Sequence, residues 1–170
     1  MFRWPGKIKK TLLFVVCFVF AGCDYEVPLS ASPKMTIDNR AVGLWEQTKE
    51  DGKKEYLLVL PLNKYEYLLV WPKGNTSELY ARAHLFEFNG NRLVQLEWFG
   101  NSDGGVPDDN RIYQIGKYAI SGDTMETQLL NTDVVNKNSN TSVELAEAIK
   151  SNSSNPSLFR KKIIYKKITR

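Results

Sequence analysis

The sequence predicts a mainly β protein, an eight-stranded antiparallel meander that closes into a small barrel, with one short helix before the last strand. Three observations predict this class. Eight short runs rich in aliphatic and aromatic residues follow one another from residue 41 onward. Turn residues such as Asn89-Gly90 separate most of these runs, as in successive hairpins. Closure removes the exposed edges that such a meander leaves, so a barrel is favoured, with a two-sheet β-sandwich as the alternative.

The first five runs span residues 41–49, 55–60, 64–71, 78–88 and 92–99. After a loop over residues 100–110, the sixth and seventh runs span residues 111–120 and 124–130. Residues 142–151 then place apolar side chains at helical spacing, so they predict one short amphipathic helix, with Thr141 or Ser142 as its cap. The last run, residues 158–168, alternates Ile and Tyr with Lys and is the eighth expected strand.

Residues 1–22 have the pattern of a secretory signal peptide. The first ten carry four basic residues and no acid, and an apolar run of 12 residues follows. That run is shorter than the roughly 20 residues that a membrane-spanning helix needs. A basic start, a short apolar stretch and a small-residue exit predict a cleaved leader. A core helix or an uncleaved anchor is the alternative.

The exit of this leader, Phe20-Ala21-Gly22-Cys23, resembles the lipobox of bacterial lipoproteins. The resemblance implies cleavage between Gly22 and Cys23, a diacylglyceryl thioether on the Cys23 sulfur, and acylation of the new amine. Asp24 follows the cysteine, and in lipoproteins of enteric-type bacteria an Asp there resembles a signal for retention in the inner membrane. A polar linker residue without a sorting role is the alternative for Asp24.

Cleavage would change both the charge and the cysteine content of the chain. The precursor has 23 basic and 19 acidic residues, and the leader removes four of the basic ones, which leaves a net charge of zero. This excludes the basic surface of a typical nucleic-acid binder. Cys17 leaves with the leader, so no free thiol is expected once Cys23 is lipidated. We expect residues 23–40 to be a lipidated cysteine and a flexible tether, and residues 41–170 to be one domain.

Gly43-Leu44-Trp45 resembles the Gly-x-Trp start of the first lipocalin strand. The resemblance implies that Trp45 closes the base of the barrel against a basic residue near the end of the chain, for which Arg160 or Lys161 is the candidate. An eight-stranded barrel encloses an interior that side chains fill or that holds one small ligand.

Candidate catalytic groups are few. His84 is the only imidazole, so no second His or free thiol is available for a metal site or a nucleophile–base pair. Glu87 and Glu97 flank the Asn89-Gly90 turn and could form a carboxylate pair as in glycoside hydrolysis, or belong to a solvated outer face. The acidic loop over residues 100–110 offers oxygen ligands for calcium, but it lacks EF-hand spacing, and a solvated loop is the alternative.

The end of the chain is basic. Residues 160–170 contain six basic residues and no acid. They could contact anionic lipid head groups, or they could protect an edge strand against pairing with other chains.

Together these patterns predict a membrane-anchored bacterial envelope lipoprotein that faces the periplasm, with Asp24 favouring the inner membrane and the outer membrane as the alternative. We expect a non-enzymatic binding module for an envelope protein partner or a small apolar molecule. The alternatives are a small hydrolase acting near His84 or the Glu pair, and a structural or inhibitory module. No catalytic residue, metal or cofactor is assigned, and no nucleic-acid partner is expected.

Overall fold

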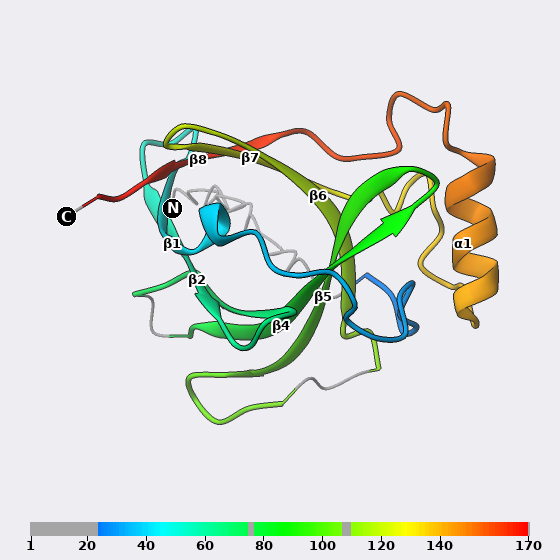
Figure 1. Cartoon of the computed structure of the whole chain (residues 1–170), viewed down its shortest axis with the longest axis horizontal. Coiled ribbons are helices and arrows are strands. Elements are labelled where there is room, and N and C mark those ends of the chain that lie inside the picture. Colours follow the sequence, from blue (N-terminus) through cyan, green and yellow to red (C-terminus); the bar gives the residue numbers. More distant parts are fainter. Residues whose placement is uncertain (1–23, 75–76, 107–109, 170) are drawn as a thin grey trace, which may run out of the picture.

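Eight antiparallel strands close into one barrel, which confirms the predicted fold class (Figure 1). The computed structural model describes residues 24–74, 77–106 and 110–169. The leader and the cleavage site at Gly22 and Cys23 lie outside these residues. The strands follow one another around the barrel in chain order: β1 (Gly43–Thr48), β2 (Lys54–Pro61), β3 (Glu66–Trp71), β4 (Leu79–Phe88), β5 (Asn91–Asn101), β6 (Tyr113–Ser121), β7 (Thr124–Leu129) and β8 (Ile163–Lys167).

Closure comes from β1, which pairs with β2 on one side and with β8 on the other. Trp45 lies opposite Leu57 on β2 and opposite Lys167 on β8. The interpretation of the C-terminal basic residues as protection for an edge strand is therefore wrong. The last strand, β8, is not at an edge, because it is hydrogen-bonded to both β1 and β7. The strand is also shorter than its apolar run, since it begins at Ile163.

The two ends of the barrel differ, and we name them by their connections. The floor end carries the β2–β3, β4–β5 and β6–β7 turns, and the loop end carries the β1–β2, β3–β4, β5–β6 and β7–β8 connections. At the floor end, Asn89 and Gly90 have φ values of 49° and 73°. Positive φ at both central residues matches the right-handed twist of a tight hairpin, so this turn forms as predicted.

The side chains of the sheet form two separate cores, one on each face. Inward-facing residues of all eight strands include Trp45, Val59, Leu85 and Met125. The second core lies outside the barrel, where the outer face of β4, β5 and β6 meets α1 (Ser142–Ser151) and the segment that precedes β1. Its buried members are Tyr25, Phe86, Leu93, Ile115, Leu130, Val135, Leu145, Ile149 and Leu158.

Helix α1 has the predicted bounds because its local signals agree. The Thr141 hydroxyl accepts a hydrogen bond from the backbone N–H of Glu144, and the Glu144 carboxylate accepts one from the N–H of Asn140. The first bond satisfies an N–H that the first helical turn leaves free, and the second holds the residue before the cap against the helix. Leu145 and Ile149, four residues apart, bury the same face of the helix in the outer core.

Residues 24–40 are not the flexible tether that the sequence predicts. Tyr25 is fully buried, and it forms an isolated bridge with Tyr113 at the start of β6. The Gln95 side chain accepts hydrogen bonds from the N–H groups of Leu29 and Ser30 and donates one to the Ser30 carbonyl. In Figure 1 this blue-to-cyan segment crosses the ring of strands. Its short helix η1 (Asn39–Ala41) packs into the inner core at the floor end.

Candidate functional site

The interior of the barrel is lined by apolar side chains, some of them only partly buried. Direct cross-strand partners share a face, so Leu57 and Leu69 point inward with Trp45 and Val59, and Leu96 points inward with Ala83. Seven inward-facing residues keep part of their surface accessible although they lie within the sheet: Leu57, Leu69, Val94, Leu96, Tyr118, Ile120 and Ile163. These are the side chains that a small apolar molecule inside the barrel would contact.

Trp45 lies at the floor end of the barrel, and the cation beside it is not one of the two expected from the sequence. Its indole N–H donates to the Ala41 carbonyl at 2.8 Å, and the side chain is fully buried. Lys167 places its ammonium 5.1 Å from the centre of the Trp45 ring and also donates to the Arg40 carbonyl. The expected partnership of Trp45 with Arg160 is therefore wrong. The cause is register, because Lys167 lies directly opposite Trp45 in the β1–β8 pair.

Polar groups in the inner face gather toward the loop end. Alternation along β2 places Glu55 on the inward face with Leu57, and its carboxylate pairs with Lys49. One buried Glu55 oxygen, Oε2, has no hydrogen-bond partner in the described part of the chain, and the buried Trp71 indole N–H lies near the Tyr165 hydroxyl. Burial, and secondarily the nearby Glu55 carboxylate, raises the pKa of Tyr165 to about 12. These groups could bind the polar end of a ligand.

A second polar contact ties the closing segment to the inner wall. The Tyr67 hydroxyl accepts from the Asp38 backbone N–H at 2.6 Å and lies 3.2 Å from the Asp38 carbonyl oxygen. The Tyr118 hydroxyl lies 3.4 Å from that of Tyr67. Burial raises the pKa of both phenols, so they stay neutral at physiological pH. This network holds the segment before β1 against the floor end of the barrel.

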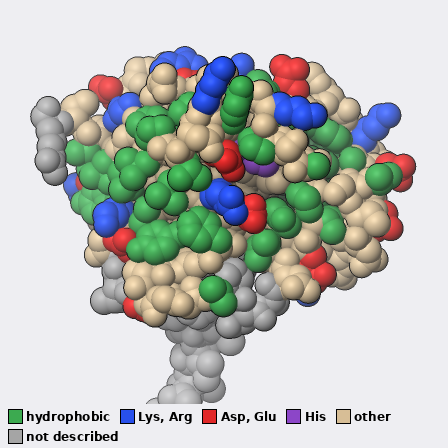
Figure 2. Space-filling model, turned by 60° about the horizontal axis from the view of Figure 1, so that its bottom comes forward, with side chains coloured by type: hydrophobic (Ala, Val, Ile, Leu, Met, Phe, Trp, Pro, Cys, Tyr) green, Lys and Arg blue, Asp and Glu red, His purple; other side chains and the backbone are tan. Residues whose placement is uncertain are grey.

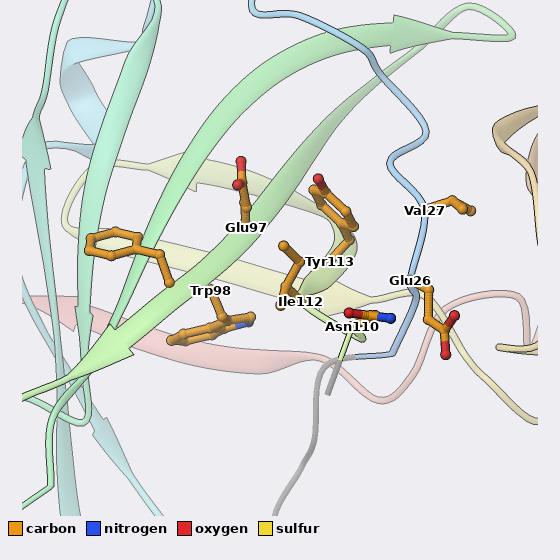
Figure 3. A pocket seen from close by; sticks show the side chains of 8 residues that line it. Glu26, Val27, Glu97, Trp98, Asn110, Ile112 and Tyr113 are labelled. Atoms are coloured by element: carbon orange, nitrogen blue, oxygen red, sulfur yellow. The ribbon is translucent and has the colours of Figure 1, made fainter. Parts of the chain in front are cut away.

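A shallow pocket of about 480 Å³ lies outside the barrel at the loop end (Figure 3). It is bounded by β5, by the start of β6 and by the segment that follows Asp24. Aromatic and acidic side chains dominate its lining, which comprises Glu26, Val27, Glu97, Trp98, Phe99, Asn110, Ile112 and Tyr113. The Trp98 indole is held by a hydrogen bond to Gln114.

Asp24 and Arg160, both singled out in the sequence, form an ion pair with each other beside this pocket. Arg160 Nη2 lies 3.0 Å from Asp24 Oδ1 and also 3.0 Å from the Thr132 hydroxyl. Asp24 is only 6% exposed, and burial raises its pKa although Arg160 opposes the shift. The buried position of its carboxylate does not suit a residue that a sorting factor must contact in the folded protein.

His84 lies on the outward face of β4, opposite Glu66 and Gln95. It is buried, and its Nε2 has no hydrogen-bond partner among the described residues. Burial lowers its pKa, so the imidazole is neutral at physiological pH. Glu66 lies opposite His84, and Glu97 lies two residues from the partner of His84 on β5 and on the same outward face, but neither accepts a hydrogen bond from His84 Nε2.

The structure separates Glu87 and Glu97, so the expectation of a carboxylate pair is wrong. Glu87 lies opposite Arg92 and Glu97 opposite Arg82, five residues farther along β4. At about 3.3 Å per residue this is roughly 16 Å. Alternation also places the two carboxylates on opposite faces of the sheet. The sequence signal misled because a hairpin turn brings its flanking residues together only at equal distances from the turn.

The remaining sequence candidates offer little chemistry. No group of three or more His, Cys, Asp or Glu side chains suited to a metal ion occurs in residues 24–74, 77–106 and 110–169. Four C-terminal lysines have partners: Lys161 contacts Glu50, Lys162 contacts Glu126, Lys166 contacts Thr124, and Lys167 contacts the Arg40 carbonyl. Figure 2 shows hydrophobic side chains interspersed with charged ones on one face of the molecule.

Within the described ranges, none of the helices has the length and apolar character required to cross a bilayer. Comparison with known proteins yields no matching family model, no matching curated protein and no matching solved structure.

Proposed function

We propose that this chain is a membrane-anchored envelope lipoprotein whose barrel binds a small apolar molecule and has no catalytic role. The anchor is the acylated Cys23 implied by the lipobox resemblance, and the compartment implied by that resemblance is the bacterial envelope, with the protein facing the periplasm. The observation that supports ligand binding is the accessible surface of inward-facing apolar residues such as Leu57, Leu69 and Leu96.

The shape of the barrel supports this proposal over the alternatives. The floor end is closed by η1 and Trp45, so an apolar molecule would enter from the loop end. Glu55 would meet its polar end, because its buried Oε2 has no hydrogen-bond partner among the described residues. Burial of a ligand's apolar surface would contribute about 25 cal/mol per Å².

A protein partner is supported less well. The large hydrophobic side chains that are exposed in the described residues are spread over several elements: Leu60, Leu62, Tyr65, Phe99, Val106, Val143, Ile164 and Ile168. A partner surface of ordinary size would instead gather apolar side chains in one patch. A hydrolase is also less well supported, because Glu87 and Glu97 lie on opposite faces of the sheet and His84 Nε2 has no hydrogen-bond partner among the described residues.

The test compares a variant that fills the interior of the barrel with a matched variant that changes its outer face. Leu69 points inward opposite Val59, whereas its neighbour Leu68 points outward opposite Leu60 and Arg82. The full-length protein and its Leu69→Trp and Leu68→Trp variants would be purified from membranes in detergent and studied by native mass spectrometry. We expect a co-purifying ligand mass in the wild type and in Leu68→Trp, and its loss in Leu69→Trp. Equal retention in both variants would contradict binding inside the barrel.

A further inference from the structure

We propose that the ligand of this barrel is an amphiphile whose head group donates a hydrogen bond to Glu55, as a hydroxyl or an amide does, and that an anionic head group is rejected. This inference rests on the proposed function, because it concerns the same interior. It goes further by naming the chemistry of the head group and the residue that selects it.

The position of Glu55 follows from the register of the first two strands. Glu55 on β2 lies directly opposite Gln47 on β1, and Leu57 lies opposite the fully buried Trp45 of the inner core. Residues two positions apart along a strand share a face, so Glu55 and Gln47 point into the barrel with Leu57 and Trp45. Because β2 begins at Lys54, this polar pair lies at the loop end of the interior.

The charge of Glu55 is set by Lys49, the residue that follows β1. The Lys49 ammonium forms an ion pair with Glu55 Oε1. The β1–β2 turn holds Lys49 in place, because its N–H donates to the Lys53 carbonyl at 2.8 Å and its own carbonyl accepts from the Gly52 N–H at 2.9 Å. The ion pair holds Glu55 in its carboxylate form, and a carboxylate accepts hydrogen bonds but cannot donate one.

The second oxygen of Glu55 is the acceptor that remains. Oε2 is buried and accepts no hydrogen bond from any described residue, whereas Oε1 is paired with Lys49. A buried charged acceptor that is left unpaired is costly in free energy. A ligand that enters the barrel displaces water from Oε2, so only a head group that brings its own donor leaves the carboxylate satisfied.

The groups around Glu55 favour a neutral head group over an anion. The Lys49 ammonium is already engaged by Oε1, so an anionic head group would face the negative charge of the carboxylate. This repulsion is stronger in the interior than in water, because the dielectric constant is lower there. Burial raises the pKa of Tyr165 to about 12, so its hydroxyl stays neutral and adds no positive charge. The Gln47 amide can both donate and accept, which suits a hydroxyl or an amide.

The apolar part of the ligand is defined by the rest of the inner face. Leu57 and Leu69 point inward between Glu55 and the floor end, and both are only partly buried. A molecule with its head group at Glu55 would therefore lay its hydrocarbon part along these side chains toward Trp45. The ligand class is thus an uncharged amphiphile with a hydrogen-bond donor at one end.

The experiment is a competition between dodecan-1-ol and dodecanoate, which share one chain length and differ in the head group. Both would be offered at equal concentration to the full-length protein in detergent, and the amphiphiles retained after gel filtration would be extracted and quantified by gas chromatography. Glu55→Gln is compared with Glu46→Gln, because Glu46 points outward opposite Tyr56 and forms an exposed ion pair with Lys54. Leu69→Trp reports whether retention takes place inside the barrel.

We expect wild type and Glu46→Gln to retain the alcohol at least about tenfold over the acid. In Glu55→Gln this preference should fall about tenfold, because the amide carries no charge and can donate to a carboxylate. Leu69→Trp should retain neither amphiphile.

Three outcomes would overturn head-group selection. Equal retention of the two amphiphiles by wild type, lost in Leu69→Trp, would do so but leave binding inside the barrel intact. A wild-type preference for dodecanoate would place the head group on Lys49 instead of Glu55, and it needs no variant to be seen. Retention in Leu69→Trp at the wild-type level would contradict binding inside the barrel, and head-group selection with it.

Discussion

The carboxylate of Asp24 lies 3.0 Å from the guanidinium of Arg160, a residue 136 positions later in the chain. This ion pair joins the start of the described chain to the residues that lead into β8, and it lies where Asp24 meets the barrel. Because Asp24 is almost completely buried, the contact matters more for stability than a surface ion pair would.

Removal of Arg160 tests this contact. Arg160→Ala leaves the buried Asp24 charge without its partner and takes a hydrogen bond from Thr132. Since Arg160 itself is 34% exposed, we expect a loss of about 2 kcal/mol in the free energy of unfolding, measured by urea denaturation. Lys161→Ala is the matched control, because the Lys161–Glu50 pair is fully solvated and its loss should cost less than about 0.5 kcal/mol. Equal losses would show that the Asp24–Arg160 pair contributes no more to the free energy of unfolding than a solvent-exposed ion pair.

The pH dependence of the same site has a definite sign. Burial raises the pKa of folded Asp24 above its ordinary value of 3.8. Protonation of Asp24 therefore stabilises the folded protein. This stabilisation is complete below pH 3.8 and is lost as the pH rises through the folded pKa. Relative to Asp24→Asn, which does not titrate, the wild type should gain stability as the pH is lowered from neutral toward 3.8. Urea unfolding of both proteins across this range measures the difference, and a gain in the opposite direction would mean that Arg160 outweighs burial.

Local signals predicted most of the fold. The Asn89-Gly90 hairpin and helix α1 depend on residues within a few positions of one another, so their type and bounds can be derived from the sequence. The docking of residues 24–42 could not be derived in this way. It depends on contacts such as Leu29 with Gln95, 66 positions apart, which only the closed barrel brings together.

In the candidate site, too, some features can be predicted from local sequence patterns and others depend on the closed barrel. The alternation along β2 places Glu55 on the inward face with Leu57 and Val59, so its position was available from the sequence once the inner face was known. The cation beside Trp45 could not be identified from the sequence, because two basic clusters near the chain end offered equivalent partners. The β1–β8 register selects Lys167, whereas Arg160 is bound by Asp24.

The lipid anchor is tested at Cys23. Cys23→Ser removes the sulfur that would accept the diacylglyceryl group, so we expect an intact mass without acyl chains and a shift of the protein from membranes toward soluble fractions. Wild-type protein should begin at an acylated Cys23. An unmodified wild-type chain that begins at Met1 would contradict both the cleavage and the anchor.

The floor of the barrel depends on Trp45. Trp45→Ala removes a fully buried side chain and should cost about 3–5 kcal/mol in the free energy of unfolding. Trp45→Phe keeps most of the apolar surface but loses the hydrogen bond to the Ala41 carbonyl, so about 1 kcal/mol is expected. Lys167→Met removes the cation over the ring and should cost about 0.5–1 kcal/mol. A loss below about 0.5 kcal/mol for Trp45→Ala would contradict its role in closure.

His84 should make stability fall in mildly acidic solution. Burial lowers the folded pKa of His84 below its ordinary value of 6.5, although Glu66 and Glu97 oppose the shift. In the unfolded chain the imidazole takes up a proton near pH 6.5, so stability is fully present above that pH and is lost as the pH falls toward the folded pKa. His84→Gln should remove this part of the pH dependence in urea unfolding. Since the chain has one histidine, its single imidazole resonance in an NMR titration reports the folded pKa directly, and a midpoint at or above 6.5 would contradict the burial argument.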